Sequence, residues 1–168
     1  YPGTQYGMDD AQSGQRATTR ERETQNANQF YRLKVMVMTN EEIEKRVERA
    51  KELFHLGYNC SQSVFAACAD IYGIEDEALA LRLSASFGGG IGRMRQTCGA
   101  ACGMFMLAGL ENGSATPHDA EGKMQNYALV QDLAAQFKAE NGSLICSELL
   151  GIAPKPQEPT PEARTEAY

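Results

Sequence analysis

Three cysteines share one local setting, and they are the residues of this chain with the most chemistry to offer. Cys60, Cys98 and Cys146 each lie at or near the expected start of a helix, after residues that commonly cap one. The first turn of a helix has unpaired backbone N–H groups and positive potential, which favour a thiolate. Because the thiolate is both the nucleophile and the metal ligand, we expect lowered pKa values here. We interpret the three cysteines as redox-active thiols or as metal ligands.

The remaining two cysteines have different settings. Cys102 follows Cys98 by four residues and therefore lies on the same helical face. Such a pair can bind one metal or cluster, but its geometry is poor for a disulfide between the two residues. Cys102 is therefore a conditional fourth ligand, beside Cys60, Cys98 and Cys146. Cys68 lies in the apolar stretch VFAACADIY, and we interpret it as a small core residue.

The segment before Cys98 is rich in glycine and arginine. FGGGIG (87–92) lacks the lysine and the Ser/Thr of a P-loop, and no strand precedes it. Glycines allow a backbone to approach a cluster, a haem or a partner helix closely. Arg93 and Arg95 would add positive charge close to Cys98. The candidate cofactor-binding residues are Gly89, Gly90, Gly99 and Arg95.

Other motifs are sparse. No C-x-x-C and no C-x-x-C-H segment occurs, which disfavours a thioredoxin-type dithiol and covalent haem attachment. His55 is expected near a helix C-terminus, where it compensates the helix dipole, and His118 in a loop before a helix.

Apolar residues at helical spacing and capping residues predict an all-α fold, a bundle of about five short helices with disordered or extended tails at both ends. No sustained β alternation occurs. In the fifth helix we expect an inward-facing set: Tyr127, Val130, Leu133, Ala134 and Phe137. The helices are expected over residues 40–56, 59–72, 75–86, 98–112 and 118–140, with a short one from Ser143, as its cap, through Cys146 to Leu150.

The chain divides into three parts by composition. Residues 1–38 are polar and are expected to be a disordered extension, with Met36 and Met38 as alternative starts; 39–152 form the helical cysteine domain, and 153–168 a proline-rich tail. The net charge of −6 over 168 residues, without a basic cluster, argues against nucleic-acid binding. No apolar run is long enough for membrane insertion, and no secretory signal is recognisable. We therefore expect a cytoplasmic protein, in which structural disulfides are uncommon.

Three segments together resemble the C-GCAxxG-C-C family of redox-active proteins: GYNCSQSV (57–64), FGGGIGRMRQTCGAACG (87–103) and ENGSLICSELLG (140–151). The resemblance covers about residues 40–168. It implies a small helical protein, often associated with transporters, that has four characteristic cysteines. The related split-Soret cytochromes suggest an iron–sulfur cluster. Cys60, Cys98 and Cys146 match the first three family cysteines, and no cysteine follows Cys146 in this sequence, so Cys102 is a candidate substitute.

Three functions follow as hypotheses. The first is electron transfer or redox sensing through an iron–sulfur cluster bound by Cys60, Cys98 and Cys146, with Cys102 as the conditional fourth ligand. The second is a metal-free thiol–disulfide oxidoreductase or sensor. The third is a structural zinc-binding helical module that serves a transporter, with zinc less favoured because it prefers four ligands. The redox partner is unknown, and a homodimer is a further possibility.

Overall fold

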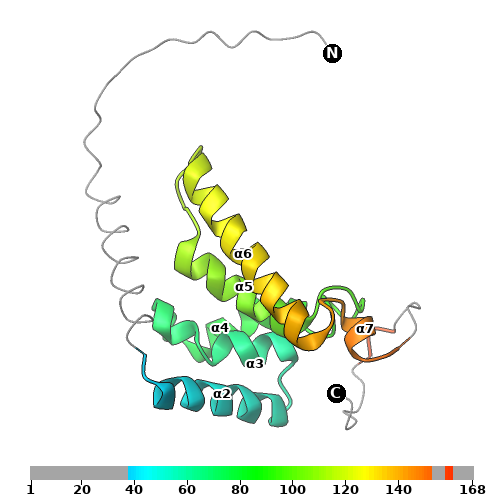
Figure 1. Cartoon of the computed structure of the whole chain (residues 1–168). Coiled ribbons are helices and arrows are strands. Elements are labelled where there is room, and N and C mark those ends of the chain that lie inside the picture. Colours follow the sequence, from blue (N-terminus) through cyan, green and yellow to red (C-terminus); the bar gives the residue numbers. More distant parts are fainter. Residues whose placement is uncertain (1–37, 153–157, 161–168) are drawn as a thin grey trace, which may run out of the picture.

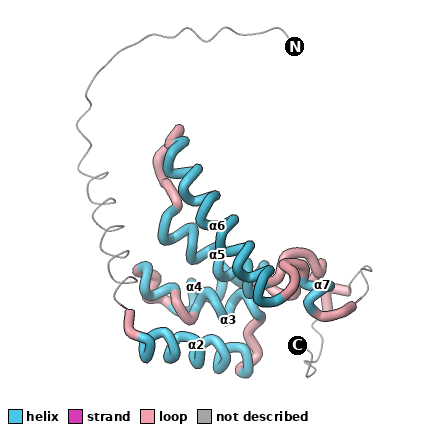
Figure 2. Tube along the Cα trace, viewed as in Figure 1, coloured by secondary structure: helices cyan, strands magenta, loops and turns pink. Residues whose placement is uncertain are grey.

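The computed structural model describes residues 38–152 and 158–160, and this part of the chain contains helices and loops but no strand. Figures 1 and 2 show the arrangement, in which the first three α-helices lie together and the long hairpin of the next two extends from them. The elements are α2 (Asn40–His55), α3 (Cys60–Ala66), η1 (Ala69–Tyr72), α4 (Glu77–Ser84), η2 (Ala85–Phe87), α5 (Gly99–Asn112), α6 (Ala120–Asn141) and α7 (Cys146–Leu149).

The short helix α3 is the centre of the fold. It packs against α2, α4 and α5, while α6 packs along α5 (Figure 1). Phe65 on α3 is 2% exposed and forms the core with Ala69 and Ala80, and Leu53 of α2 is fully buried. Burial of a large side chain such as Phe65 or Leu53 contributes about 1.5–3 kcal/mol to the stability of the fold. The start of α3, which carries Cys60, is therefore held by contacts on several sides.

Capping residues fix where the first two helices begin. Thr39 forms a capping box with Glu42, in which each side chain binds the backbone N–H of the other residue. Asn59 forms the same reciprocal pair with Gln62 at the start of α3. The sequence offers Thr39 or Asn40 as the cap of the first helix and Asn59 or Ser61 as the cap of the second, and the structure uses Thr39 and Asn59. The all-α fold class is confirmed.

Three details of the sequence-based prediction are wrong. Ser143 does not cap the short last helix, because the N-cap of α7 is Ile145 and the Ser143 hydroxyl accepts from the Ile145 N–H at 2.9 Å. The expected second helix does not continue to residue 72, because α3 ends at Ala66 and the shorter 3₁₀ helix η1 follows. Tyr127 does not face inward, since it is 62% exposed. No residue of α6 is buried, because this helix packs against α5 along one side and leaves a broad face in solvent. Val130, Leu133, Ala134 and Phe137 of the same set are half-buried.

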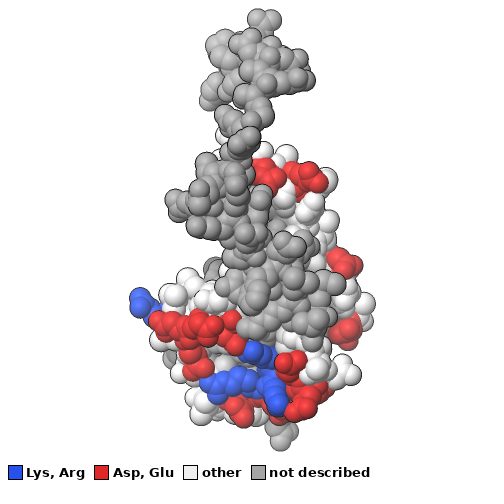
Figure 3. Space-filling model, turned by 90° about the vertical axis from the view of Figure 1, so that its left-hand side faces the viewer, with Lys and Arg blue, Asp and Glu red and all other residues white. Residues whose placement is uncertain are grey.

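Charged side chains of both signs lie beside one another on the face shown in Figure 3. Along α2, Lys45 pairs with Glu41 at 2.8 Å and Lys51 with Glu48 at 2.7 Å, and Arg49 reaches Glu77 of α4 at 2.6 Å. Such exposed pairs add little stability. These pairs give α2 the mixed charges of a solvated helix surface.

None of the helices in the described residues is long and apolar enough to cross a membrane. The expected disorder of residues 1–37 and most of the expected proline-rich tail fall outside the described part of the chain.

Candidate cysteine site

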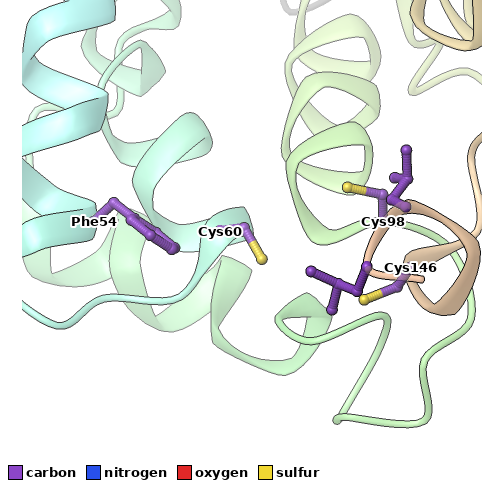
Figure 4. Close-up of a pocket in the computed structure, with 6 residues that line it drawn as sticks. Phe54, Cys60, Cys98 and Cys146 are labelled. Carbon is purple, nitrogen blue, oxygen red and sulfur yellow. The ribbon is translucent and has the colours of Figure 1, made fainter. Parts of the chain in front are cut away.

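Three of the five cysteines line one cavity. Cys60, Cys98 and Cys146 border a space of about 140 Å³, and the rest of its wall is apolar: Phe54, Leu149 and Leu150. Figure 4 shows the three sulfur atoms directed toward the space between Cys60 on one side and Cys98 and Cys146 on the other. Phe54 lies on the side of Cys60 that is away from the other two cysteines. The structure thus brings together the three cysteines that the sequence analysis singled out, although they come from three separate parts of the chain.

Cys60 is placed by the capped start of α3. It is the first residue of the helix, and the Asn59–Gln62 capping box directly precedes and spans it. The Asn59 side chain also donates from Nδ2 to the Ala85 carbonyl at 2.8 Å, which ties the start of α3 to η2. The backbone of Cys60 is therefore held at an ordered helix start rather than in a loop.

Cys98 and Cys146 are held next to one another by backbone pairing. Thr97 and Ile145 form an isolated antiparallel bridge. The Cys98 N–H donates to the Leu144 carbonyl at 2.8 Å, and the Cys146 N–H donates to the Gln96 carbonyl at 2.6 Å. Cys98 is the N-cap residue of α5, and Cys146 is the first residue of α7. The prediction that all three cysteines lie at helix starts is confirmed.

The glycines approach protein atoms of the site. A Cβ on Gly90 would lie 2.7 Å from Cys146 Cβ, and a Cβ on Gly99 would lie 2.9 Å from Cys60 Sγ. Gly89 has a φ of 62° and Gly90 a φ of 75°, a left-handed conformation in which a side chain is strained. These glycines let the loop and α5 close around the thiols. The role of Gly89, Gly90 and Gly99 in binding a cofactor stays a prediction.

Arg95 contacts a different cysteine from the one expected. Its side chain is 4% exposed, and its Nη1 donates to Cys146 Sγ at 3.9 Å. From the sequence, in which Arg95 precedes Cys98 by three residues, this positive charge was expected beside Cys98. The left-handed loop instead turns the guanidinium toward α7. A direct contact between Arg95 and a bound cofactor stays a prediction.

Burial controls the acidity of two thiols. It raises the pKa of Cys146, with the guanidinium of Arg95 acting in the opposite direction and the nearby Cys60 and Cys98 raising the pKa further. Burial also raises the pKa of Cys102, and Cys98 and Cys60 add to this increase. The expected lowering of the Cys146 pKa is therefore wrong for the metal-free protein, because desolvation outweighs the favourable charges around the sulfur.

The other candidates lie around or outside this cavity. Cys102 is 7% exposed, and its Sγ lies 3.9 Å from the Thr97 carbonyl, but it does not line the cavity. Cys68 is half-buried rather than fully buried, near Arg46, and burial raises its pKa. His55 is in the last turn of α2, as expected. His118 is exposed in the loop before α6.

The donor atoms suit a thiophilic metal or cluster, but they do not form a closed site for a single ion. All five cysteines are free thiols. Within residues 38–152 and 158–160, no group of three or more His, Cys, Asp or Glu side chains is arranged to hold one metal ion. Three thiols around a cavity, with a fourth close behind Cys98, are nevertheless the ligand type that iron–sulfur clusters use. The donor chemistry therefore fits a cluster.

Sequence reasoning did not assign the apolar wall of the cavity to the site. In the sequence, Phe54 is one apolar position of the helix expected over residues 40–56, and Leu149 and Leu150 belong to the short helix expected through Cys146. Their closeness to the cysteines in sequence was the available signal, since Leu149 is three residues after Cys146.

A family model matches the part of the chain that contains the cavity cysteines. No curated protein and no solved structure matches the chain. The model of the family described as "Putative redox-active protein (C_GCAxxG_C_C)" matches residues 58–167, a range that includes all three cavity cysteines. This chain therefore belongs to the C_GCAxxG_C_C family of redox-active proteins.

Proposed function

We propose that this protein transfers electrons or senses redox state by binding an iron–sulfur cluster through Cys60, Cys98 and Cys146. One observation carries the proposal: three free thiols from three segments of the chain line the same cavity. Cys102 is the proposed fourth ligand, because it is coupled to Cys98 and Cys60 and lies one helical turn from Cys98. Thiolates are the usual ligands of such clusters.

The electrostatics of the thiols support a cationic occupant. Burial raises the pKa of Cys146 and of Cys102, and the charges of the neighbouring Cys60 and Cys98 raise both pKa values further, because each ionised cysteine disfavours ionisation of the next. A bound metal removes this repulsion, since a coordinating thiol is deprotonated outright. The group of thiols is therefore unfavourable as free thiolates but suitable as a set of metal ligands.

The surrounding residues have roles of their own. Phe54, Leu149 and Leu150 form an apolar wall that limits water around the sulfurs. Apolar surroundings and nearby donors adjust the reduction potential of a metal centre. A bound cluster would supply one-electron exchange, while the chain supplies ligands, partial exclusion of water and the charge of Arg95.

Anaerobic reconstitution tests this proposal. The full-length protein is treated with ferrous iron and sulfide, desalted, and analysed for iron, acid-labile sulfide and visible absorbance. We expect bound iron and sulfide, with strong losses in the Cys60→Ser, Cys98→Ser and Cys146→Ser variants. Cys68→Ser is the matched control, because Cys68 is a half-buried cysteine that does not line the cavity. A colourless, iron-free protein after reconstitution would contradict the proposal.

The conditional ligand needs a separate variant. If Cys102 is the fourth ligand, Cys102→Ser lowers the iron content or changes the absorbance while leaving some cluster bound. A Cys102→Ser protein identical to the parent in both readouts would exclude it as a ligand. The same metal analysis measures zinc and thereby tests the structural zinc hypothesis.

A metal-free dithiol is the second candidate, favoured by the free state of three cavity thiols whose charges interact. Two thiols would form a disulfide and release two protons and two electrons to an oxidant such as oxidised glutathione. Intact-mass measurement then shows a loss of about two daltons that dithiothreitol reverses. Absence of a reversible change in the iron-free protein would exclude this candidate. Cytoplasmic location, a transporter partner and a homodimer stay predictions.

A further inference from the structure

The loop between η2 and α5 buries one positive charge next to the cavity. Arg95 is 4% exposed, and its guanidinium Nη1 is 3.9 Å from the sulfur of Cys146. A buried guanidinium loses favourable hydration, and this loss is offset only by nearby acceptors and negative charge. A sulfur that becomes negative on ionisation or on metal binding is such a partner.

The backbone around Arg95 is built to hold this position. Arg95 itself has a φ of 58°, which is unusual for a residue with a side chain. Its N–H donates to the Gly89 carbonyl at 3.2 Å, and its own carbonyl accepts from the Ser147 N–H at 3.3 Å. The residue is therefore tied both to the glycine segment and to the residue after Cys146. Strained conformations of this kind persist where the surrounding structure determines them, and they are concentrated at functional sites.

Cys146 is fixed to the same loop from its other side. Its N–H donates to the Gln96 carbonyl at 2.6 Å, and its Cβ would lie 2.7 Å from a Cβ added to Gly90. The backbone and the sulfur of Cys146 are thus held by consecutive residues of one loop. The sulfur of Cys60 instead lies close to α5, since a Cβ on Gly99 would be 2.9 Å from it.

We infer that Arg95 is a positioning residue that supplies a fixed positive charge to the sulfur of Cys146 and thereby makes Cys146 electrostatically distinct within the cavity. Where it concerns a bound cluster, this inference rests on the proposed function. It deepens that function by assigning Arg95 as the residue that sets the electrostatic environment of one ligand, Cys146. The charge at Cys146 is also present in the metal-free protein. It can therefore be tested whether or not iron is bound.

Competitive labelling of the full-length, iron-free protein tests the inference. The reduced protein is treated with equal concentrations of iodoacetate, which is anionic, and iodoacetamide, which is neutral, and the ratio of products at each cysteine is measured by peptide mass mapping. Both reagents attack the thiolate, so their ratio reports local charge rather than the ionised fraction. Cys102 is the internal reference, because it is similarly buried and its coupled neighbours are Cys98 and Cys60.

We expect the anionic-to-neutral ratio at Cys146 to fall roughly three- to tenfold in Arg95→Gln, while the ratio at Cys102 stays unchanged. Arg95→Lys retains the charge and should restore a large part of the ratio at Cys146. An unchanged ratio at Cys146 in Arg95→Gln, or an equal fall at both cysteines, would overturn the inference.

A measurement on the unsubstituted protein keeps the test decisive if Arg95→Gln does not fold. Salt screens the attraction between a guanidinium and an approaching carboxylate. The ratio at Cys146 should therefore fall as ionic strength rises, and it should fall more steeply than the ratio at Cys102. Equal salt dependence at the two cysteines would overturn the inference. Iron analysis of the same preparation after reconstitution tests the proposed function separately. A failure of the inference about Arg95 can therefore be distinguished from a failure of the cluster proposal.

Discussion

Thr97 pairs with Ile145 across an isolated antiparallel bridge, and the residue that follows each of them is a cysteine of the cavity. The two hydrogen bonds beside this bridge start from the N–H groups of Cys98 and Cys146. The relative position of these two thiols is therefore determined by backbone geometry. Side-chain packing around the cavity supports this relative position, but the backbone pairing alone is enough to establish it.

Gly90→Ala should destabilise the protein. The added Cβ would lie 2.7 Å from both Cys146 Cβ and the Gln96 N atom, at a φ of 75° that strains any side chain. We expect the free energy of unfolding to fall by about 2–4 kcal/mol, measured by urea denaturation. Gly109→Ala is the matched control, because Gly109 lies within α5 and a Cβ there meets nothing within 4 Å. It should raise stability by about 0.5–1 kcal/mol, and equal effects of the two substitutions would contradict this account.

Gly99→Ala should affect the site more than the fold. The new Cβ would lie 2.9 Å from Cys60 Sγ, which can rotate away, and 3.0 Å from the Phe87 carbonyl, which has less freedom. Because Gly99 has no left-handed φ, we expect a smaller loss of unfolding free energy than for Gly90→Ala. The amount of iron bound after reconstitution should nevertheless decrease, because the new Cβ forces the Cys60 side chain out of its present orientation. Undiminished iron content would show that the close approach of α5 to Cys60 is not required.

Cluster assembly should accelerate as pH rises. Burial raises the pKa of Cys146 and of Cys102 above the ordinary thiol value, so both retain protons at neutral pH in the metal-free protein. Each must lose its proton to become a ligand. The initial rate of iron incorporation at fixed iron and sulfide should thus increase from about pH 7 to about pH 9. A rate independent of pH would contradict this reasoning.

The raised pKa values of Cys146 and Cys102 also predict that the metal-free protein becomes less stable as pH rises, whereas cluster assembly becomes faster. Thiols of the unfolded chain ionise at their ordinary pKa, whereas Cys146 and Cys102 of the folded protein stay protonated to higher pH. Their contribution to stability is present below the ordinary thiol pKa and is lost as pH rises through the raised values. The free energy of unfolding of the metal-free protein should therefore decline across this range, and Cys102→Ser should make the decline less steep.

Arg95→Gln should make the reduction potential of a reconstituted cluster more negative. A positive charge near Cys146 stabilises the state with one more electron, and the substitution removes that charge. Arg95→Lys should lie between the parent and Arg95→Gln. Redox titration followed by visible absorbance measures the shift. If the two variants have the parent potential, Arg95 does not act on the centre through its charge.

Much of the helical framework could be predicted from the sequence because its signals are local. Thr39 with Glu42 and Asn59 with Gln62 are reciprocal capping pairs three residues apart, so they require no distant partner. The placement of Cys60, Cys98 and Cys146 at helix starts followed from the same reasoning. The burial of α6 could not be predicted this way. Its exposure depends on how many neighbours pack against it, and the orientation of Tyr127 was wrong for that reason.

The sequence by itself determined the helical class, the starts of α2 and α3 and which three cysteines to consider together. Only the tertiary structure decided that they share one cavity, that Phe54 closes its wall, and that Arg95 faces Cys146 rather than its sequence neighbour Cys98. The physical reason is the range of the interactions involved. Caps act within one turn of a helix, whereas the pairing of Thr97 with Ile145, the left-handed loop and the desolvation of the thiols arise from segments that meet only when the chain folds.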